Sequence, residues 1–137
     1  MPARDLYHEA VKRALVKEQW TITHDPLLFS YGEVNFQVDL ALERLLAAQR
    51  GHEKIAIEIK SFLRSSAITD FYGALGQYLC YRLALKLSEP ERRLYLAVPL
   101  NSYEKFFQTK FAEAVIAEFS ISLIVYNIND EVIHLWQ

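Results

Sequence analysis

The sequence predicts an α/β or α+β sandwich, in which helices flank a mixed β-sheet. Its 137 residues are the usual length of one compact domain, and 52% of them are hydrophobic, which is enough to build a core. Segments with apolar residues at helical spacing alternate along the chain with segments in which apolar and polar residues alternate. The four prolines and four glycines are scattered, so we expect a single domain over residues 1–137.

The first half of the chain predicts one helix followed by three strands. The helix is expected over residues 4–19, where apolar residues form one stripe. A short strand at 20–24 ends before the Asp-Pro pair that follows it. The second strand carries the alternating apolar residues Phe36, Val38 and Leu40. The third strand is expected at 54–61, and the segment 43–54 that precedes it is either helix-like or one arm of a hairpin.

The second half predicts a long helix at residues 66–87, in spite of Gly73 and Gly76. A strand at 92–99 and two short helices at 102–107 and 110–119 follow. The chain is expected to end in a hairpin whose strands are 121–127 and 131–136. The predicted order is α-β-β-β-α-β-α-α-β-β. Because the early strands are close together in the chain, we expect them to pair as an antiparallel meander.

Charge and cysteine content restrict the classes of function. With a net charge of −2 and a pI of about 6.1, the chain has no global field that would hold it on nucleic acid or on an anionic membrane. A local binding patch or a nuclease site is still compatible with this charge. The lone Cys80 forms no intrachain disulfide and is expected to be a small buried residue. The chain shows neither an apolar leader nor an apolar run of membrane-spanning length, so we expect a cytoplasmic protein with no membrane partner.

The functional interpretation depends on the segment KIAIEIKSF, residues 54–62. Three isoleucines alternate there with Glu58 and Lys60, and on the preceding strand the apolar residues of 36–40 alternate with Asp39. If the two apolar sets share one core face, Asp39, Glu58 and Lys60 share the opposite face. The sequence therefore predicts two carboxylates and an ammonium group close together at neighbouring strand ends.

Two neighbouring carboxylates repel each other unless a cation joins them. Oxygen ligands suit a hard divalent ion such as Mg²⁺, and the backbone carbonyl of Ile59 could supply a third oxygen. Such an ion activates water and neutralises a phosphoryl group, while Lys60 could stabilise the charge that develops during phosphodiester cleavage. The alternative is a solvated sheet face with a cross-strand ion pair.

The spacing of Asp39 and the tripeptide Glu58-Ile59-Lys60 resembles the signature of PD-(D/E)XK nucleases, with Val38 in place of the proline. Gln77 and Tyr81 resemble the QxxxY element of the RecB-like branch, and the first helix offers a matching acid. The resemblance implies a restriction-endonuclease-like core of order α-β-β-β-α-β. It implies that the catalytic residues are Asp39, Glu58, Lys60, Gln77 and Tyr81. It also implies a Mg²⁺ or Mn²⁺ ion held by Asp39, Glu58, the Ile59 carbonyl and Glu9.

Over nearly its whole length, the chain resembles the XisH family, the fdxN-element excision controlling factors of cyanobacteria. The resemblance is carried by residues 1–27, by VDLALERLLAAQRG at 38–51, by 55–82 and by LYLAVP at 94–99. It implies a role in a programmed DNA rearrangement during heterocyst differentiation. The implied partners are DNA, an XisI-type companion protein and a separate site-specific recombinase.

Two functions therefore stay open. One is a metal-dependent DNA endonuclease, and the other is a nuclease-fold module that binds DNA or a partner without cutting and so regulates a recombinase. Plain structural roles also stay open for Gln77 and Glu9, as solvent-exposed helix residues, and for Tyr81, as a core residue. His8 and Arg64 could contact phosphate. The last strand could pair with a second copy of the chain, which would give a homodimer.

Overall fold

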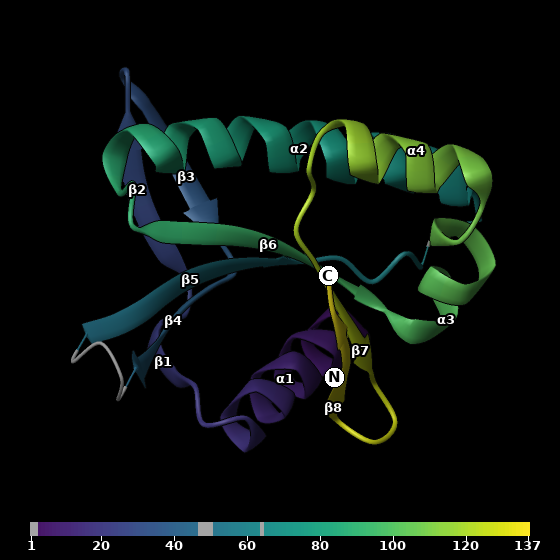
Figure 1. The fold of residues 1–137 in the computed structure, drawn as a ribbon, viewed down its shortest axis with the longest axis horizontal. Helices are drawn as coiled ribbons and strands as arrows, with labels where there is room; N and C mark the ends of the chain where they lie inside the picture. The colour runs from purple at the N-terminus through teal and green to yellow at the C-terminus, as the bar shows by residue number, and fades with distance from the viewer. Residues whose placement is uncertain (1–2, 47–50, 64) are drawn as a thin grey trace.

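The computed structural model of the chain describes residues 3–46, 51–63 and 65–137 and has three layers, with the β-sheet between two layers of helices (Figure 1). In the view of Figure 1, α1 lies below the sheet, and α2 and α4 lie above it. The elements are α1 (Ala3–Lys17), β1 (Thr21–His24), β2 (Leu27–Tyr31), β3 (Val34–Val38), β4 (Leu40–Leu46), β5 (Gly51–Ile59), α2 (Ala67–Ser88), β6 (Arg92–Pro99), α3 (Leu100–Ser102), the π-helical turn η1 (Tyr103–Phe107), α4 (Lys110–Glu118), β7 (Leu123–Asn127) and β8 (Val132–Trp136).

The main sheet is mixed and has the strand order β1-β4-β5-β6-β7-β8. β1, β4 and β5 are antiparallel, β5, β6 and β7 are parallel, and β8 returns antiparallel to β7. The prediction of a mixed sheet flanked by helices is confirmed, and so are the antiparallel pairing of the early strands and the terminal hairpin. A separate two-stranded ribbon, β2 and β3, rises from the sheet toward α2.

Two expectations about the early strands need correction. The expected strand at 36–40 is divided at Asp39, and β2 was not foreseen at all. The segment 43–54 has no helix in its described part, because β4 and β5 form a long antiparallel ladder that leads into the hairpin. The tip of this hairpin, residues 47–50, lies outside the described part of the chain.

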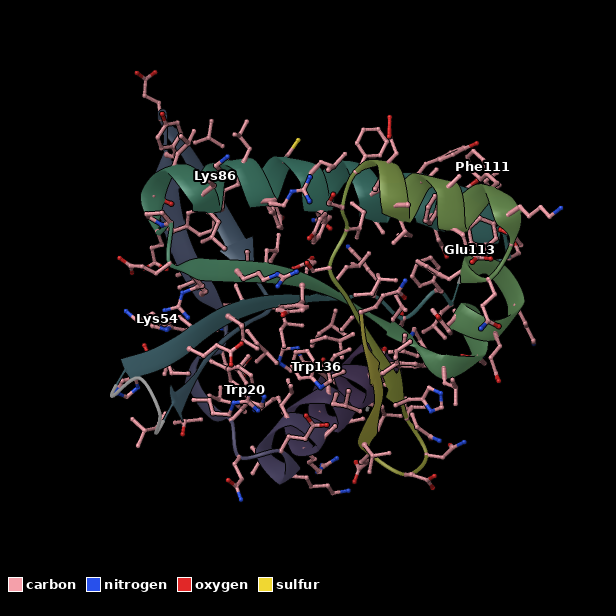
Figure 2. The ribbon with its side chains drawn as sticks, viewed as in Figure 1. Trp20, Lys54, Lys86, Phe111, Glu113 and Trp136 are labelled. Atoms are coloured by element: carbon pink, nitrogen blue, oxygen red, sulfur yellow. The ribbon has the colours of Figure 1, made fainter. Side chains whose placement is uncertain are left out.

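The core on the α1 side of the sheet holds the isoleucines that the sequence marked. Ile55 and Ile57 of β5 are buried beside Leu40 and Leu42 of β4, under Leu15 of α1. Each such side chain, fully buried, contributes about 1.5–3 kcal/mol. Trp20, which follows α1, stacks on Trp136 of β8 with ring centroids 5.9 Å apart, and Figure 2 shows both on this side of the sheet. Helix α1 is therefore fixed to the sheet by one continuous apolar layer.

The opposite face of the sheet is buried as well. Ala41 of β4 and Ala56 of β5 pack there against Phe71 and Tyr78 of α2, in a cluster that also contains Val38. The expectation that Phe36 and Val38 share a face with the isoleucines is wrong. The chain bends at Asp39 as it passes from β3 to β4, so Val38 and Leu40 lie in different cores.

Helix α2 starts at a side-chain cap, since Ser66 Oγ accepts a hydrogen bond of 3.3 Å from the Thr69 N–H. Its inner face is buried, but its outer face is also apolar and leaves Tyr72 and Leu83 exposed. Cys80 lies on the exposed side too, so the expectation that it is buried is wrong. Within the described residues, no helix is both long and apolar enough to cross a membrane.

Candidate functional site

Asp39 and Glu58 continue the pairing of β4 and β5 beyond the end of the strand ladder. The ladder ends at Leu40 and Ile57, so the next pair along the two chains is Asp39 and Glu58. The Ile59 N–H donates to Asp39 Oδ2 over 2.7 Å, and the Asp39 N–H donates to Glu58 Oε1 over 3.3 Å. Each carboxylate thus accepts a hydrogen bond from the backbone of the other strand, and the two acids are held side by side.

Glu58 is buried, with 5% of its surface exposed. Burial raises the pKa of its carboxyl, the neighbouring charge of Asp39 raises it further, and Lys60 offsets part of this effect, with the pKa reaching about 7. Lys60 Nζ lies 3.5 Å from Glu58 Oε2. Without a further cation, Glu58 is therefore partly protonated near neutral pH, and a divalent ion would have to displace that proton.

Lys60 follows directly after β5, and its backbone is held on both sides. Its N–H donates to the carbonyl of Ala97 in β6 over 2.9 Å, and its carbonyl accepts a hydrogen bond from the Tyr126 hydroxyl over 3.0 Å. Its side chain is 30% exposed and reaches back toward Glu58. The ammonium group is thus accessible to solvent while its backbone is fixed.

Gln77 and Tyr81 lie one turn apart on α2 and contact each other. Gln77 Nε2 donates to the Tyr81 hydroxyl over 2.9 Å, and Gln77 Oε1 is buried with no hydrogen-bond partner among the described residues. Burial raises the pKa of Tyr81, the Gln77 hydrogen bond offsets part of the rise, and the charges of Glu58 and Asp39 add to it. Gln77 lines the same pocket as Asp39 and Glu58, whereas Tyr81 is not part of the described lining.

Asp39, Glu58, Lys60 and Gln77 line a pocket of about 680 Å³, in the size range of sites for small ligands. It opens where β5 ends, beneath the first turns of α2. Asp39, Glu58 and Asp70 line it together with Lys60, so acidic groups outnumber lysines in its described lining. The other residues that line it are Tyr7, His8, Ile59, Ser61, Phe62, Leu63, Thr69, Gly73, Ala74 and Gln77.

The structure does not bring Glu9 to this pocket. Glu9 Oε2 lies 3.6 Å from Lys12 Nζ on the same helix, and Glu9 is not part of the pocket lining. Its neighbour His8 does line the pocket, with Nε2 2.7 Å from Asp25 Oδ1. Arg64 lies outside the described residues.

Sequence reasoning missed several residues around the pocket. Tyr7, Thr69 and Asp70 reach it because α1 and α2 cross the end of β5, which no local pattern reveals. Tyr126 comes from β7, sixty-six residues after Lys60. A tyrosine in a run of apolar residues such as LIVYN gives only the signal of a buried strand.

The donor set fits a hard divalent ion. Among residues 3–46, 51–63 and 65–137, no group of three or more His, Cys, Asp or Glu side chains could hold a metal. Asp39 and Glu58 are a close pair of carboxylates, and the unsatisfied Gln77 Oε1 adds a neutral oxygen to the same pocket. Mg²⁺ binds through one or two carboxylates and keeps several waters, so two acids with oxygen neighbours are sufficient.

Comparison with known proteins identifies the family. The model of the XisH protein family matches residues 1–134. A crystal structure of an XisH family protein from Nostoc punctiforme PCC 73102 is 50% identical, covers 96% of this chain and 98% of its own, and superposes with a TM-score of 0.88. A crystal structure of an fdxN element excision controlling factor protein from Anabaena variabilis is 49% identical with the same coverage and a TM-score of 0.87. No curated protein matches the chain. By the extent of the family match and by its identity to these two structures, the chain belongs to the XisH family.

Proposed function

We propose that the protein controls the programmed excision of a DNA element and that it does so as a metal-dependent DNA endonuclease with a PD-(D/E)XK-type site. The observation that carries the nuclease part is the pairing of Asp39 with Glu58 beside Lys60, with the pKa of Glu58 raised to about 7. Strongly perturbed carboxyl groups in a pocket are typical of functional sites. The name of the Anabaena variabilis relative supports the excision-control part.

In this proposal, Asp39, Glu58 and the Ile59 carbonyl hold a Mg²⁺ or Mn²⁺ ion at the end of β5. When bound, such an ion would lower the pKa of a bound water and would offset the charge of the phosphoryl oxygens. Lys60 donates to the oxygen on which negative charge develops, because its ammonium group lies in the pocket beside Glu58. Gln77 Oε1, which has no partner among the described residues, accepts a hydrogen bond from the attacking water, and the Tyr81 hydroxyl, which accepts from Gln77 Nε2, donates to a phosphate oxygen.

The charge of the pocket supports the need for a metal. Asp39 and Glu58 lie side by side in its described lining, so this pair of carboxylates would repel a phosphodiester. A divalent ion held by the pair would offset that charge and would let a DNA strand approach. A protein of net charge −2 would then bind DNA through its site more than through its surface.

The test is a cleavage assay on linear, branched and single-stranded DNA with Mg²⁺ or Mn²⁺, with the protein alone and with its XisI-type companion. We expect cleavage that Asp39→Asn and Glu58→Gln abolish. A matched control is Glu53→Gln, on the same strand but paired with Arg44 away from the pocket. Cleavage that persists in both site variants would come from a contaminating nuclease, and no cleavage of any DNA would overturn the catalytic proposal.

A second candidate is a nuclease-fold module that binds DNA or a partner and regulates a site-specific recombinase without cutting. Asp39 and Glu58 each already accept a backbone hydrogen bond that closes the end of the β4–β5 ladder. These two hydrogen bonds contribute to the fold whether or not an ion is bound, so the presence of the pair alone does not require catalysis. A homodimer through the edge strand β8 is compatible with either function.

A further inference from the structure

Tyr126 is a buried residue whose hydroxyl contacts the backbone of the site. It lies on β7, has no exposed surface, and packs edge-to-face on Tyr7 of the pocket wall with ring centroids 6.2 Å apart. Its hydroxyl donates to the Lys60 carbonyl over 3.0 Å. A buried hydroxyl costs free energy unless it is hydrogen-bonded, and Phe would fill the same space without that cost. The core is therefore filled equally well without the hydroxyl, and the hydrogen bond to the Lys60 carbonyl is what tyrosine adds at this position.

The Lys60 carbonyl lies where the strand ladder gives no further support. The pairing of β5 with β6 ends at Ile59 and Ala97, and the Lys60 N–H makes the last bond, to the Ala97 carbonyl over 2.9 Å. Two residues later, Phe62 takes a φ of +53°, a left-handed conformation that is costly for a bulky residue. The chain thus turns sharply away just after Lys60, and the Tyr126 hydroxyl holds the peptide that precedes the turn.

We infer that Tyr126 is a positioning residue that fixes Lys60 in the site from the far side of the sheet. The inference rests on the proposed function in so far as it concerns cleavage. The hydroxyl and the Ala97 carbonyl hold the two peptide groups of Lys60, so the direction of its side chain toward Glu58 follows from two neighbouring strands. The β7–β8 hairpin thereby becomes part of the site, although it contributes no side chain to the pocket lining.

The test is Tyr126→Phe, which removes only the hydroxyl, with Tyr78→Phe as the matched control. Tyr78 is equally buried, and its hydroxyl donates to the Leu94 carbonyl over 3.1 Å and accepts from the Ser122 N–H over 3.1 Å, so Tyr78→Phe removes at least as many hydrogen bonds from the core. Both variants should lose some stability. Only Tyr126→Phe should lower kcat, by roughly 10- to 100-fold because the ammonium group is misplaced, with the affinity for Mn²⁺ unchanged. Equal kcat values for Tyr126→Phe and wild type would overturn the inference.

A double-mutant cycle separates positioning of Lys60 from a general loss of order. In a Lys60→Ala background, Tyr126→Phe should cause no further loss of kcat, because the group that it positions is gone. A full additional loss in that background would show that Tyr126 acts elsewhere, and the inference would fail.

Amide hydrogen exchange gives a readout that does not depend on cleavage. Tyr126→Phe should speed the exchange of the Lys60 amide, which donates to the Ala97 carbonyl, by about tenfold or more while the amides of β6 keep their protection. Tyr78→Phe should leave the exchange of the Lys60 amide unchanged. If the protein cuts no DNA but this exchange pattern holds, the proposed nuclease function fails while the positioning of Lys60 stands. Unchanged exchange in Tyr126→Phe would overturn the positioning itself.

Discussion

The Glu58 carboxylate binds the backbone of Asp39, and the Asp39 carboxylate binds the backbone of Ile59, the residue after Glu58. Asp39 Oδ2 accepts from the residue that follows Glu58, and Glu58 Oε1 accepts from the N–H of Asp39. This reciprocal arrangement brings two carboxylates together at the end of a strand pair, at the cost of a strongly raised pKa for Glu58. The two carboxylates repel each other, and removing the charge of either one should relieve this repulsion.

Asp39→Asn should leave the metal-free protein as stable as wild type or slightly more stable. The amide oxygen can still accept from the Ile59 N–H, and the charge that repels Glu58 is removed. Asp39→Ala should instead cost about 1–3 kcal/mol, because the Ile59 N–H loses its partner. Thermal unfolding of the three proteins measures this, and a large loss of Tm in Asp39→Asn would show that Asp39 is mainly structural.

The stabilising effect of metal should disappear in the same Asp39→Asn variant. Wild-type Tm should rise with Mn²⁺ or Mg²⁺ concentration, as expected for a ligand that binds only the folded state. A variant with Glu53→Gln, which leaves the pocket intact, should respond like wild type. An equal rise of Tm in Asp39→Asn would place the ion elsewhere.

Glu58 should make stability fall as pH rises from about 4.5 to about 7. Its pKa is raised from 4.5 to about 7 on folding, so the folded state binds more protons than the unfolded state in this interval. The contribution is fully present below the lower value and is lost as pH rises through the higher one, an effect on the order of 1–3 kcal/mol. Chemical denaturation at several pH values should show this slope in wild type and a flatter dependence in Glu58→Gln.

Lys60→Ala and Glu58→Ala should have different kinetic profiles. Lys60→Ala should keep metal binding and lose at least ~10²-fold in kcat, because the ammonium group acts on charge that develops in the transition state. Glu58→Ala should lose both metal affinity and rate, because it removes a ligand. Titration of Mn²⁺ against cleavage rate separates the two, and identical profiles would contradict the assigned roles.

Gln77→Met should leave stability nearly unchanged while it lowers activity. The substitution removes the buried Gln77 Oε1, which has no partner in the described structure, but it also removes the hydrogen bond to Tyr81. These two effects oppose each other in the free energy of unfolding, whereas the substitution removes the polar amide of a residue that lines the pocket. Unfolding and cleavage measured on the same preparation test this, and unchanged cleavage would make Gln77 a packing residue.

The sequence by itself determined the helix and strand periods, the mixed sheet and the shared face of Glu58 and Lys60. These follow from local rules, since a strand of period two must put Glu58 and Lys60 on the face opposite the isoleucines. The position of Asp39 needed the structure, because Val38 and Leu40 do not share a face and the pairing of Leu40 with Ile57 sets Asp39 beside Glu58. The QxxxY spacing likewise places Gln77 and Tyr81 on one side of α2.

Only the tertiary structure decided what surrounds that pair. Val38 lies in the core on the α2 side, whereas Leu40 lies in the core on the α1 side. The reason is that the chain bends at Asp39: the β2–β3 ribbon packs on α2, and the alternation of side chains between the two sheet faces starts anew in β4. Glu9 points to Lys12 and not to the pocket, since the rotation of α1 is set by the apolar stripe that it buries. Tyr126 meets Lys60 because two parallel crossovers bring β7 two strands from β5, and contacts across that sequence distance leave no local pattern to read.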